Sequence, residues 1–336
     1  MLEHNIIVVG TSAGGVEALT YLVKHLPADL NAAVIIVLHV SSHSISILPK
    51  ILNRAGNLPV SHAQDGEAIV HGWIYVAPPD HHLLVEQGYL RLTRGAKENR
   101  CRPAIDPLFR SAARTYGQRV IAVLLTGMLD DGTAGIMAVK MRGGVAIVQN
   151  PDDALYPNMP RNAIDNVEDI DHIAPLSDIP SILVALVNIP MEIQPENPVP
   201  SKMEFETEIA QLSLEAVENE GDRPGKPSTF GCPDCGGILW ELEEGNLLRF
   251  RCRTGHAYSV ETLLATQSDK VEDALWIALR ALEEKASLSH RIASRMEARN
   301  QNLAAERFKE EAQSAWQRSA IIREVLLKIN PNIDVD

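Results

Sequence analysis

A glycine-rich turn near the start of the chain, residues 10–15, carries the first side chain that could do chemistry. The turn reads Gly-Thr-Ser-Ala-Gly-Gly and directly follows the apolar run Ile6–Val9. The pattern Gly-x-Ser-x-Gly between a strand and a helix is that of a nucleophile elbow, which exposes a serine hydroxyl at the edge of a sheet. A glycine-rich turn at a helix start can also bind a phosphate group. Taken alone, the turn leaves two interpretations open, a serine nucleophile at Ser12 and a phosphate-binding loop.

A serine nucleophile needs a base, and the base needs a residue that orients it. Two later predicted strands lead into suitable residues, because His39 directly follows the second strand and an acid, Asp130 or Asp131, lies in the loop after the fourth. Since the carboxyl ends of parallel strands meet at one edge of a sheet, we expect both side chains to lie near Ser12. Asp130 is the less favoured candidate for the orienting acid, because neighbouring side chains usually point apart. These residues together favour nucleophilic catalysis.

The elements that must position these residues alternate along the first 190 positions. Short apolar runs predict strands at Ile6–Val9, Val34–Leu38, Trp73–Val76, Val120–Leu125 and Val145–Val148. Helical patterns lie between them at Val16–His25, Pro107–Tyr116 and Thr133–Met141. This alternation predicts an α/β fold with a doubly wound, mostly parallel sheet. The glycines at 10, 14 and 15 do not match the dinucleotide-binding spacing, and His39 stands where such folds place an acid.

Several further motifs make the sequence resemble the protein-glutamate methylesterase domain of bacterial chemotaxis, the CheB type. The resemblance covers about residues 5–185 and implies a Rossmann-like methylesterase domain. The matching segments, besides the elbow and His39, are Asp65-Gly66-Glu67, Tyr75 to His82, Arg102-Pro103 with Asp106, Thr126-Gly127-Met128, Asp131-Gly132, Gln149-Asn150 and Met159-Pro160-Arg161.

The resemblance implies a role for each residue of the site. Ser12 would attack the methyl ester of a chemoreceptor glutamate, His39 would take its proton and later activate water, and Asp131 would stabilise the imidazolium. The implied chemistry needs no cofactor, and it extends to deamidation of receptor glutamines. The oxyanion and substrate cleft would be formed by Met128, through its backbone N–H, together with Ala13 and Gly14.

The sequence also departs from the family pattern. Leu129 and Asp130 replace the usual Gly-Asn pair before the catalytic acid, and Ala13 replaces a commoner threonine. The family usually carries a phosphorylatable receiver domain ahead of the esterase, and this sequence starts directly with the predicted first strand. We therefore expect that control lies elsewhere in the chain or with a partner response regulator.

A second group of reactive residues lies in the C-terminal third. Cys232 and Cys235 form a Cys-x₂-Cys pair, and Cys252 and His256 follow within a short distance. Three thiolates and one imidazole in two clusters suit a tetrahedral Zn²⁺ ion. Two short strands, at 238–241 and 247–251, would connect the clusters as in a zinc ribbon. With all four ligand positions filled, the predicted Zn²⁺ would be structural rather than catalytic.

The last 70 residues predict long helices. The range 260–330 contains neither proline nor glycine, and apolar residues recur at helical spacing up to a break near Asn300. We expect a helical hairpin or coiled coil that either self-associates through an apolar seam or docks on a helical signalling partner. The predicted domains are a methylesterase domain at 1–190, an acidic, proline-rich linker at 191–227 with a helix near 205–217, a zinc-ribbon-like segment at 228–260 and a helical segment at 261–330.

Composition narrows the function classes. The net charge of −13 argues against a nucleic-acid-binding protein. The sequence contains no run of 18 apolar residues, so it predicts no membrane-spanning helix. We expect a cytoplasmic protein. The predicted function is a serine hydrolase that demethylates chemoreceptors. The alternatives are a catalytically silent scaffold that binds receptors or other signalling proteins, and a nucleotide-binding module at the glycine-rich turn.

Overall fold

The computed structural model describes residues 5–43, 46–190, 198–212 and 225–329. The chain divides into two compact units, Met1–Leu263 and Leu264–Asp336. Most of the predicted linker, 191–197 and 213–224, lies outside the described residues. Ten of its described residues form helix α7 (Ser201–Ala210), which begins earlier than the helix predicted near 205–217.

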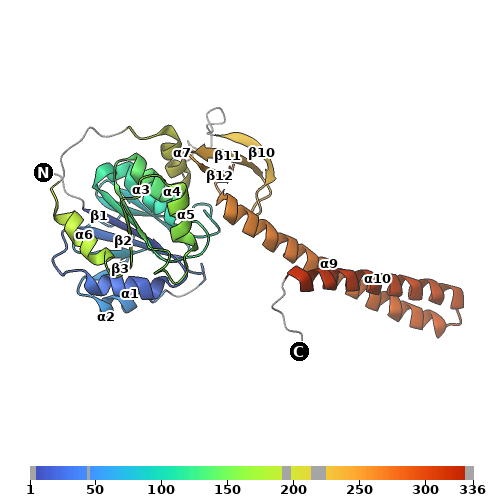
Figure 1. Cartoon of the computed structure of the whole chain (residues 1–336). Coiled ribbons are helices and arrows are strands. Elements are labelled where there is room, and N and C mark those ends of the chain that lie inside the picture. Colours follow the sequence, from blue (N-terminus) through green and yellow to red (C-terminus); the bar gives the residue numbers. More distant parts are fainter. Residues whose placement is uncertain (1–4, 44–45, 191–197, 213–224, 330–336) are drawn as a thin grey trace. The chain divides into compact units, whose positions relative to one another are not determined.

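A seven-stranded parallel sheet forms the centre of the first unit (Figure 1). Its strand order is β3-β4-β2-β1-β7-β8-β9. The strands are β1 (Ile6–Thr11), β2 (Ala33–Leu38), β3 (Val60–His62), β4 (Ile74–Val76), β7 (Val120–Leu124), β8 (Val145–Gln149) and β9 (His172–Ala174). The predicted α/β fold with a doubly wound sheet is confirmed. The five predicted strands are all present, whereas the short strands β3 and β9 were not predicted.

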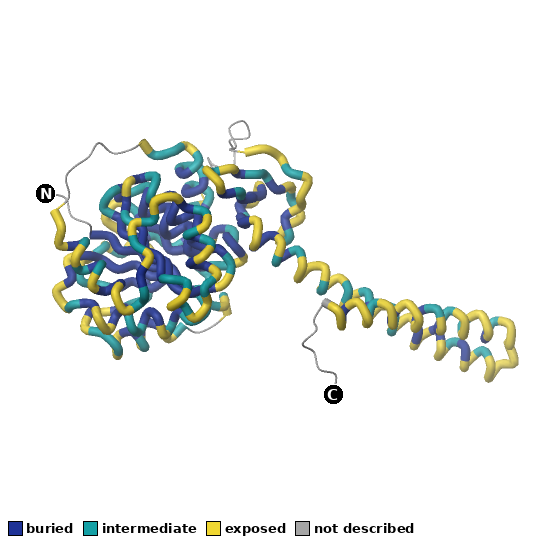
Figure 2. The backbone as a smooth tube through the Cα atoms, in the orientation of Figure 1, coloured by how far each residue is buried: buried dark blue, intermediate teal, exposed yellow. Residues whose placement is uncertain are grey.

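Helices cover both faces of this sheet, and the two faces carry separate apolar cores. One face packs against α3 (Ile105–Tyr116), α4 (Thr133–Met141) and α5 (Asn158–Asn166). The other packs against α1 (Gly15–His25), α2 (Leu48–Ala55) and α6 (Ile179–Asn188). Because strand residues alternate between the faces, Val8 belongs to the first core and Val9 to the second. Figure 2 shows the sheet as the most deeply buried part of this unit.

The order of the strands explains where a site can form. β1 lies between β2 and β7 in the sheet. From β1, the strand order continues toward one edge through β2 and toward the other edge through β7. At such a switch point, the loops after neighbouring strands separate and leave space for a ligand. His39 follows β2 and Ser12 follows β1, while the loop 125–132 follows β7. The fold therefore brings the predicted site residues to one edge of the sheet.

Two smaller sheets complete the first unit. The hairpin of β5 (His82–Glu86) and β6 (Tyr89–Thr93) packs against α3. A four-stranded antiparallel sheet follows, in the order β10-β11-β12-β13, and we call it the ribbon. Its strands are β10 (Lys226–Gly231), β11 (Ile238–Glu244), β12 (Leu247–Cys252) and β13 (Ala257–Ser259). The two strands predicted for this segment are present but longer, and they are flanked by two more.

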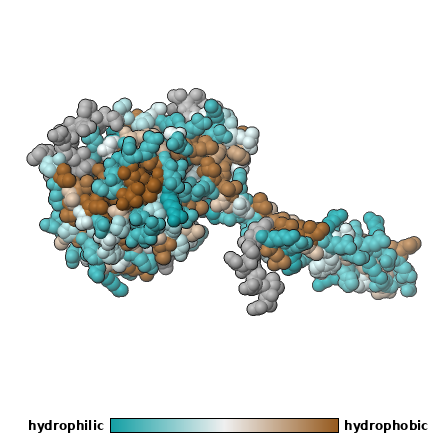
Figure 3. Space-filling model, in the orientation of Figure 1, coloured by the Kyte–Doolittle hydropathy of each residue, from teal (hydrophilic) through white to brown (hydrophobic). Residues whose placement is uncertain are grey.

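The C-terminal helices are α9 (Val260–Glu297) and α10 (Asn302–Ile329), which meet where the sequence predicted a break. Within the second unit, small residues are buried between the two helices, among them Ala286 and Ala293 on α9 and Ala305 and Ala312 on α10. Figure 3 shows apolar side chains gathered where α10 ends beside α9, whereas the loop end of the hairpin is mostly hydrophilic. Within the described ranges, no helix combines the length and apolar character needed to cross a membrane.

Candidate active site

Ser12 stands in the tight turn between β1 and α1. Gly14 has a φ of 73°, a left-handed conformation that side chains disfavour. A Cβ atom on Gly15 would lie 2.7 Å from the side chain of Thr11, so only glycine fits there. The backbone N–H of Ser12 donates to the carbonyl of Thr126 at 3.0 Å, and the Thr11 hydroxyl donates to the same oxygen at 2.8 Å. These contacts join the elbow to the loop after β7.

Ser12, His39 and Asp131 form a continuous hydrogen-bonded chain. The Ser12 Oγ lies 3.1 Å from Nδ1 of His39, and Nε2 of His39 lies 2.7 Å from Oδ2 of Asp131. The side chain of His39 is 14% exposed and that of Asp131 is 4% exposed. A hydroxyl, an imidazole and a buried carboxylate in this order have the geometry of a nucleophile, a base and an orienting acid.

Donors surround the Asp131 carboxylate. The backbone N–H of Ile105 donates to Oδ2 at 2.7 Å, and the side-chain amide of Asn99 donates to Oδ1 at 3.0 Å. Burial works to raise the pKa of Asp131, but the hydrogen bond and charge of His39, with the donors at Ile105 and Asn99, lower it to about 2. The carboxylate is thus held ionised beside the imidazole.

The groups around Ser12, His39 and Asp131 also affect the pKa of the imidazole. Burial works to lower the pKa of His39, but the Cys101 sulfur and the Asp131 carboxylate raise it above its usual value. Asp106 lies beside Asp131, and burial together with that negative charge raises the pKa of Asp106. Asp131 is therefore the ionised member of this carboxyl pair. No motif in the sequence connects Cys101 with the site.

The loop after β7 lies close to Ser12. A Cβ atom on Gly127 would lie 3.0 Å from Cβ of Ser12 and 2.3 Å from Sδ of Met159, so the loop needs glycine here. No described residue accepts a hydrogen bond from the backbone N–H of Met128 or of Ala13. By contrast, the N–H of Gly127 is taken by the carbonyl of Tyr156 at 3.0 Å. The predicted oxyanion donor at Met128 and its neighbour at Ala13 are therefore available to a ligand.

The unusual pair before Asp131 has a conformational consequence. Leu129 adopts a φ of 61°, a left-handed conformation in which a residue other than glycine costs about 1–2 kcal/mol. The Asn162 side chain donates to the Leu129 carbonyl at 3.0 Å and helps to hold this turn. Asp130 is buried, and its carboxylate accepts hydrogen bonds from Ser259 and Thr262, far along the chain. The backbone strain at Leu129 is of a kind that is typical of functional loops.

Other polar residues of the matching motifs have structural partners. Arg102 donates to the Asp80 carboxylate through Nε at 2.9 Å, and His82 is fully buried with Nε2 at 2.9 Å from the Ala96 carbonyl. Sequence reasoning missed Asn99, whose amide reaches Asp131, because nothing in the local pattern marks it. A φ of 48° at this asparagine is visible only in the structure.

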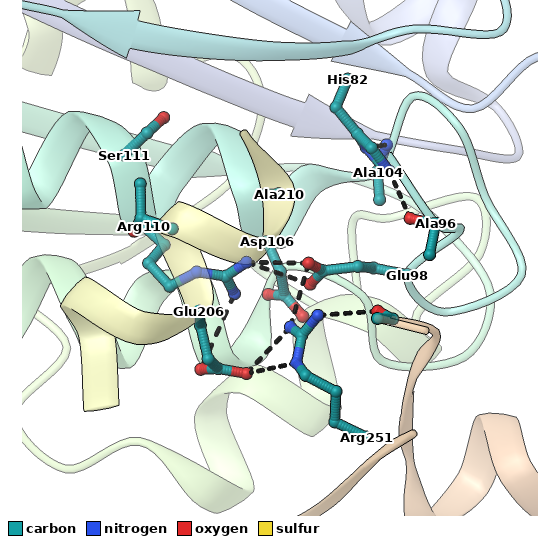
Figure 4. Close-up of polar contacts among 12 residues, drawn as sticks. His82, Ala96, Glu98, Ala104, Asp106, Arg110, Ser111, Glu206, Ala210 and Arg251 are labelled. Carbon is teal, nitrogen blue, oxygen red and sulfur yellow. Dashed lines mark hydrogen bonds and ion pairs between the residues drawn. The ribbon is translucent and has the colours of Figure 1, made fainter. Parts of the chain in front are cut away.

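A buried ion network connects the esterase residues with the ribbon (Figure 4). Arg251 on β12 donates to Glu206 on α7 at 2.9 Å and lies 3.0 Å from Glu98. Arg110 on α3 donates to the same Glu98 at 2.9 Å, and Arg249 donates to Glu206 at 2.5 Å. Burying charges is costly unless they are paired, and here each carboxylate faces two or more guanidinium groups. Helix α7, in the predicted linker, is thus part of the folded unit.

The predicted metal ligands come together in the ribbon. Atoms of Cys232, Cys235, Cys252 and His256 all lie within 4.8 Å of one another. The Sγ atoms of Cys235 and Cys252 are 3.6 Å apart, and Sγ of Cys252 is 3.5 Å from Nδ1 of His256. Tetrahedral Zn²⁺, with Zn–S of about 2.3 Å and Zn–N of about 2.0 Å, separates two sulfurs by about 3.8 Å and sulfur from nitrogen by about 3.5 Å. The donor set fits such an ion, and the sulfurs are too far apart for a disulfide.

Local geometry prepares the Cys235 thiol to bind a cation. Burial works to raise the pKa of Cys235, but the backbone N–H of Gly237 and the hydroxyl of Thr254 lower it to about 6. The ligands must be deprotonated to bind metal, so donors aimed at a thiolate favour binding. A turn in which the N–H of Gly236 donates to the Cys232 carbonyl at 2.8 Å shapes the first ligand pair.

Comparisons with known proteins identify the family of the residues that carry this site. Residues 7–183 match the family model described as CheB methylesterase. A relative from Leptospira interrogans is 35% identical over 186 residues, which are 55% of this chain and 96% of that protein. The Rhodospirillum rubrum protein-glutamate methylesterase/protein-glutamine glutaminase 1 is 35% identical over 190 residues, and the match spans 49% of its length.

A solved structure shares the fold of the matched part. The Thermotoga maritima CheB methylesterase catalytic domain has a TM-score of 0.53 and 33% sequence identity, and the match covers 55% of this chain and 100% of that domain. The matched residues 7–183 include the elbow, the strands of the parallel sheet and the Ser12–His39–Asp131 chain. On these matches, the chain belongs to the CheB methylesterase family.

Proposed function

We propose that this protein is a serine hydrolase that removes methyl esters from glutamate side chains of chemoreceptors. The observation that carries the proposal is the hydrogen-bonded chain from Ser12 Oγ through His39 to Asp131. The names of relatives in the same family, which pair protein-glutamate methylesterase with protein-glutamine glutaminase, supply the substrate class. Nothing in the described residues favours a nucleotide at the glycine-rich turn over this chemistry.

The acylation step uses the imidazole as a base. Neutral His39 accepts the Ser12 proton at Nδ1 while Oγ attacks the ester carbonyl, and Nε2–H stays bonded to Asp131. The tetrahedral intermediate collapses as His39 returns the proton to the leaving oxygen, which departs as methanol and leaves a glutamyl ester on Ser12. The N–H groups of Met128 and Ala13 would hold the oxyanion, each contributing about 3 kcal/mol to transition-state stabilisation.

Deacylation reverses these roles. Water replaces methanol, gives a proton to His39 Nδ1 and attacks the acyl carbon. His39 then returns the proton to Ser12 Oγ as the Ser12–acyl bond breaks, and the glutamate side chain is released as an acid that ionises in water. With a glutamine side chain, the same first step would release ammonia instead of methanol. Both reactions form the same acyl-enzyme, which is why we include glutamine deamidation in the proposal.

The test is methanol release from a methylated chemoreceptor by the purified full-length chain. We expect release by the wild type, no detectable release by Ser12→Ala, and wild-type release by Ser177→Ala, an exposed serine whose hydroxyl donates to Asp178. A wild-type protein that leaves the ester intact, or a Ser12→Ala variant that releases methanol at the full rate, would overturn the proposal.

We further propose that the ribbon binds one structural Zn²⁺ through Cys232, Cys235, Cys252 and His256. The support is the donor set and its ligand-to-ligand distances. When bound, the ion would fix the ribbon's turns, and with four protein ligands it would leave no position for substrate. Catalysis itself needs no cofactor in this scheme.

The remaining proposals concern organisation and partners. We keep the predicted division into a methylesterase domain, a linker, the ribbon and the helical segment, with α7 packed on α3 within the linker range. The substrate partner is a methylated receptor in the cytoplasm. The apolar residues exposed on the second unit, such as Trp276 and Ile321, support self-association of the helices or their docking on a signalling partner.

A further inference from the structure

The segment 257–262, which spans β13 and the first turn of α9, lies against the active-site loops. We call it the docking segment. The backbone N–H of Ala257 donates to the Lys97 carbonyl at 3.2 Å, and the N–H of Asn99 donates to the Ala257 carbonyl at 2.8 Å. The docking segment thus pairs with the loop 97–101 in the manner of an added strand. It follows His256, the last candidate zinc ligand, without an intervening residue.

Asn99 carries this contact to the triad. Its side-chain Oδ1 accepts a hydrogen bond from the Ser259 backbone N–H at 3.0 Å. Its Nδ2 donates to Asp131 Oδ1 at 3.0 Å and to Asp106 Oδ2 at 2.9 Å. Asn99 is only 6% exposed, and its amide is fixed on one side by the docking segment and on the other by the two carboxyl groups. The orientation of Asp131 therefore depends on a residue that the docking segment holds.

A second contact acts on the neighbour of Asp131. The Ser259 hydroxyl donates to Asp130 Oδ1 at 2.6 Å, and the Thr262 hydroxyl donates to the same oxygen at 3.0 Å. The Thr262 N–H donates to the Ser259 Oγ at 3.0 Å, which fixes the serine rotamer. Asp130 is 7% exposed, so these hydroxyls replace most of its contact with water. Asp130 and Asp131 are thus both held by side chains outside the loop 125–132.

The buried ion network fixes the docking segment to the esterase residues (Figure 4). Arg251 donates to the Gly255 carbonyl at 2.8 Å, two residues before the docking segment. The same guanidinium contacts Glu98, the residue before Asn99, and Glu206 on α7. A change in the position of the ribbon would therefore disturb Asn99 in two ways, through Glu98 and through the docking segment.

We propose that Asn99 is a positioning residue for the triad acid, and that the docking segment, through Ser259 and Thr262, holds Asn99 and Asp130 in the geometry that hydrolysis needs. The ribbon and the start of α9 thus act as a built-in support of the active site, outside the family-matched residues 7–183. This inference rests on the proposed esterase function. Its test must therefore first show that the wild type hydrolyses esters.

The assay uses p-nitrophenyl acetate with the full-length chain, because this small ester reports triad chemistry without a receptor. Active sites are counted by titration with a fluorophosphonate, and folding is followed by circular dichroism. If the wild type hydrolyses neither this ester nor a methylated receptor, the proposed function fails. If the wild type is active, the variants below decide the positioning proposal.

Asn99→Gly removes the amide without straining the backbone, because φ is 48° at this position. We expect kcat per titrated site to fall about 100-fold with little change in KM, since a displacement of about 1 Å in a catalytic group has effects of this size. We also expect the acidic midpoint of the kcat/KM profile to move to lower pH, because a displaced Asp131 supports the imidazolium less. A merely structural role would reduce the folded fraction and leave that midpoint unchanged.

The docking segment is tested by the double variant Ser259→Ala/Thr262→Val, which removes only hydroxyl groups. We expect kcat to fall about 10-fold or more and the acidic midpoint to move in the same direction as in Asn99→Gly. The matched control is Ser268→Ala on the same helix, whose hydroxyl bonds to the Leu264 carbonyl. It should keep wild-type values.

The two variants together give a decision. A loss of kcat per site and a shifted midpoint in both support the proposal. Wild-type kcat and midpoint in both, with an active wild type, would overturn it. Should Asn99→Gly fail to fold, the double variant alone decides. It keeps the backbone contacts between the docking segment and the loop 97–101. Besides the two bonds to Asp130, it removes the bond from the Thr262 N–H to the Ser259 Oγ.

Discussion

The Ser259 hydroxyl lies 2.6 Å from the Asp130 carboxylate, although the two residues are 129 positions apart. Asp130 precedes Asp131, so this contact ties the acid end of the Ser12–His39–Asp131 chain to the beginning of α9. The Asp130 carboxylate accepts a second hydrogen bond at the same oxygen, from the Thr262 hydroxyl.

The role of Asp131 leads to a first prediction. Asp131→Asn should lower kcat for methyl ester hydrolysis by about 10⁴-fold, because an amide cannot stabilise the imidazolium and favours the wrong tautomer. The measurement is kcat on p-nitrophenyl acetate and on methylated receptor. Asp152→Asn, at an exposed position, is the control and should keep full activity. Retention of wild-type kcat by Asp131→Asn would remove this residue from the mechanism.

Cys101 gives a prediction on pH dependence. Burial lowers the pKa of His39, and the Cys101 sulfur opposes burial by raising it. Hydrolysis requires the neutral base, so activity rises with pH through the pKa of His39. Cys101→Ala should therefore move the acidic midpoint of kcat/KM to lower pH while leaving the maximal rate close to that of the wild type. An unchanged midpoint would mean that the sulfur does not act on the imidazole.

The ion network predicts both stability and its pH dependence. Burial opposes the charge of Glu206, but Arg249, Arg110 and Arg251 lower its pKa from 4.5. A carboxylate with a lowered pKa stabilises the folded state above its unfolded pKa, and this stabilisation is lost as pH falls through the folded value. The contribution of Glu206 to the free energy of unfolding should thus be constant above about pH 5 and fall progressively below about pH 4.5.

Glu206→Gln tests the same network directly. Because it leaves buried guanidinium groups with one fewer carboxylate, it should lower the free energy of unfolding by about 3–5 kcal/mol and weaken the acid dependence. Chemical denaturation at several pH values measures both effects. Glu243→Gln, an exposed glutamate on β11, should change stability by less than about 0.5 kcal/mol. Equal stability of the two variants would show that the network contributes nothing net.

The cysteine cluster predicts about one zinc per chain in protein purified without chelators. Removal of the ion with a strong chelator should lower the melting temperature of the ribbon, because a segment with so small an apolar core folds poorly alone. Elemental analysis and thermal unfolding check the two parts. Cys235→Ser should lower the zinc content, whereas Cys101→Ser, outside the cluster, should leave it unchanged. Full stability in metal-free protein would contradict the proposal.

The sequence predicted the parallel sheet because its central strands are continuous apolar runs. It predicted that His39 and Asp131 lie near Ser12 because His39 directly follows one such run and Asp131 lies in the loop after another. The short strands β3 and β9 escaped prediction because each spans only three residues. Helix α7 was expected in a linker, since the charged Glu206 gave no sign of burial. Its partners Arg249 and Arg251 lie more than 40 positions away.

The support of the triad was also beyond the reach of the sequence. Asn99 and Ser259 are polar residues with no local motif, and they meet only when the ribbon packs beside the loop 97–101. The partners of Asp130 escaped prediction for the same reason, because its side chain bonds to Ser259 and Thr262, which lie about 130 positions away. Contacts between residues far apart in sequence depend on tertiary packing. They cannot be predicted from the residue pattern of a single segment.

The central claim is that Ser12 is the nucleophile of a methylesterase. The most direct measurement is mass spectrometry of the full-length chain after reaction with a fluorophosphonate. We predict one adduct per chain on the peptide that contains Ser12, loss of ester hydrolysis in proportion to labelling, and no adduct in Ser12→Ala. An adduct on another residue that abolishes hydrolysis while Ser12 stays unmodified would contradict the account.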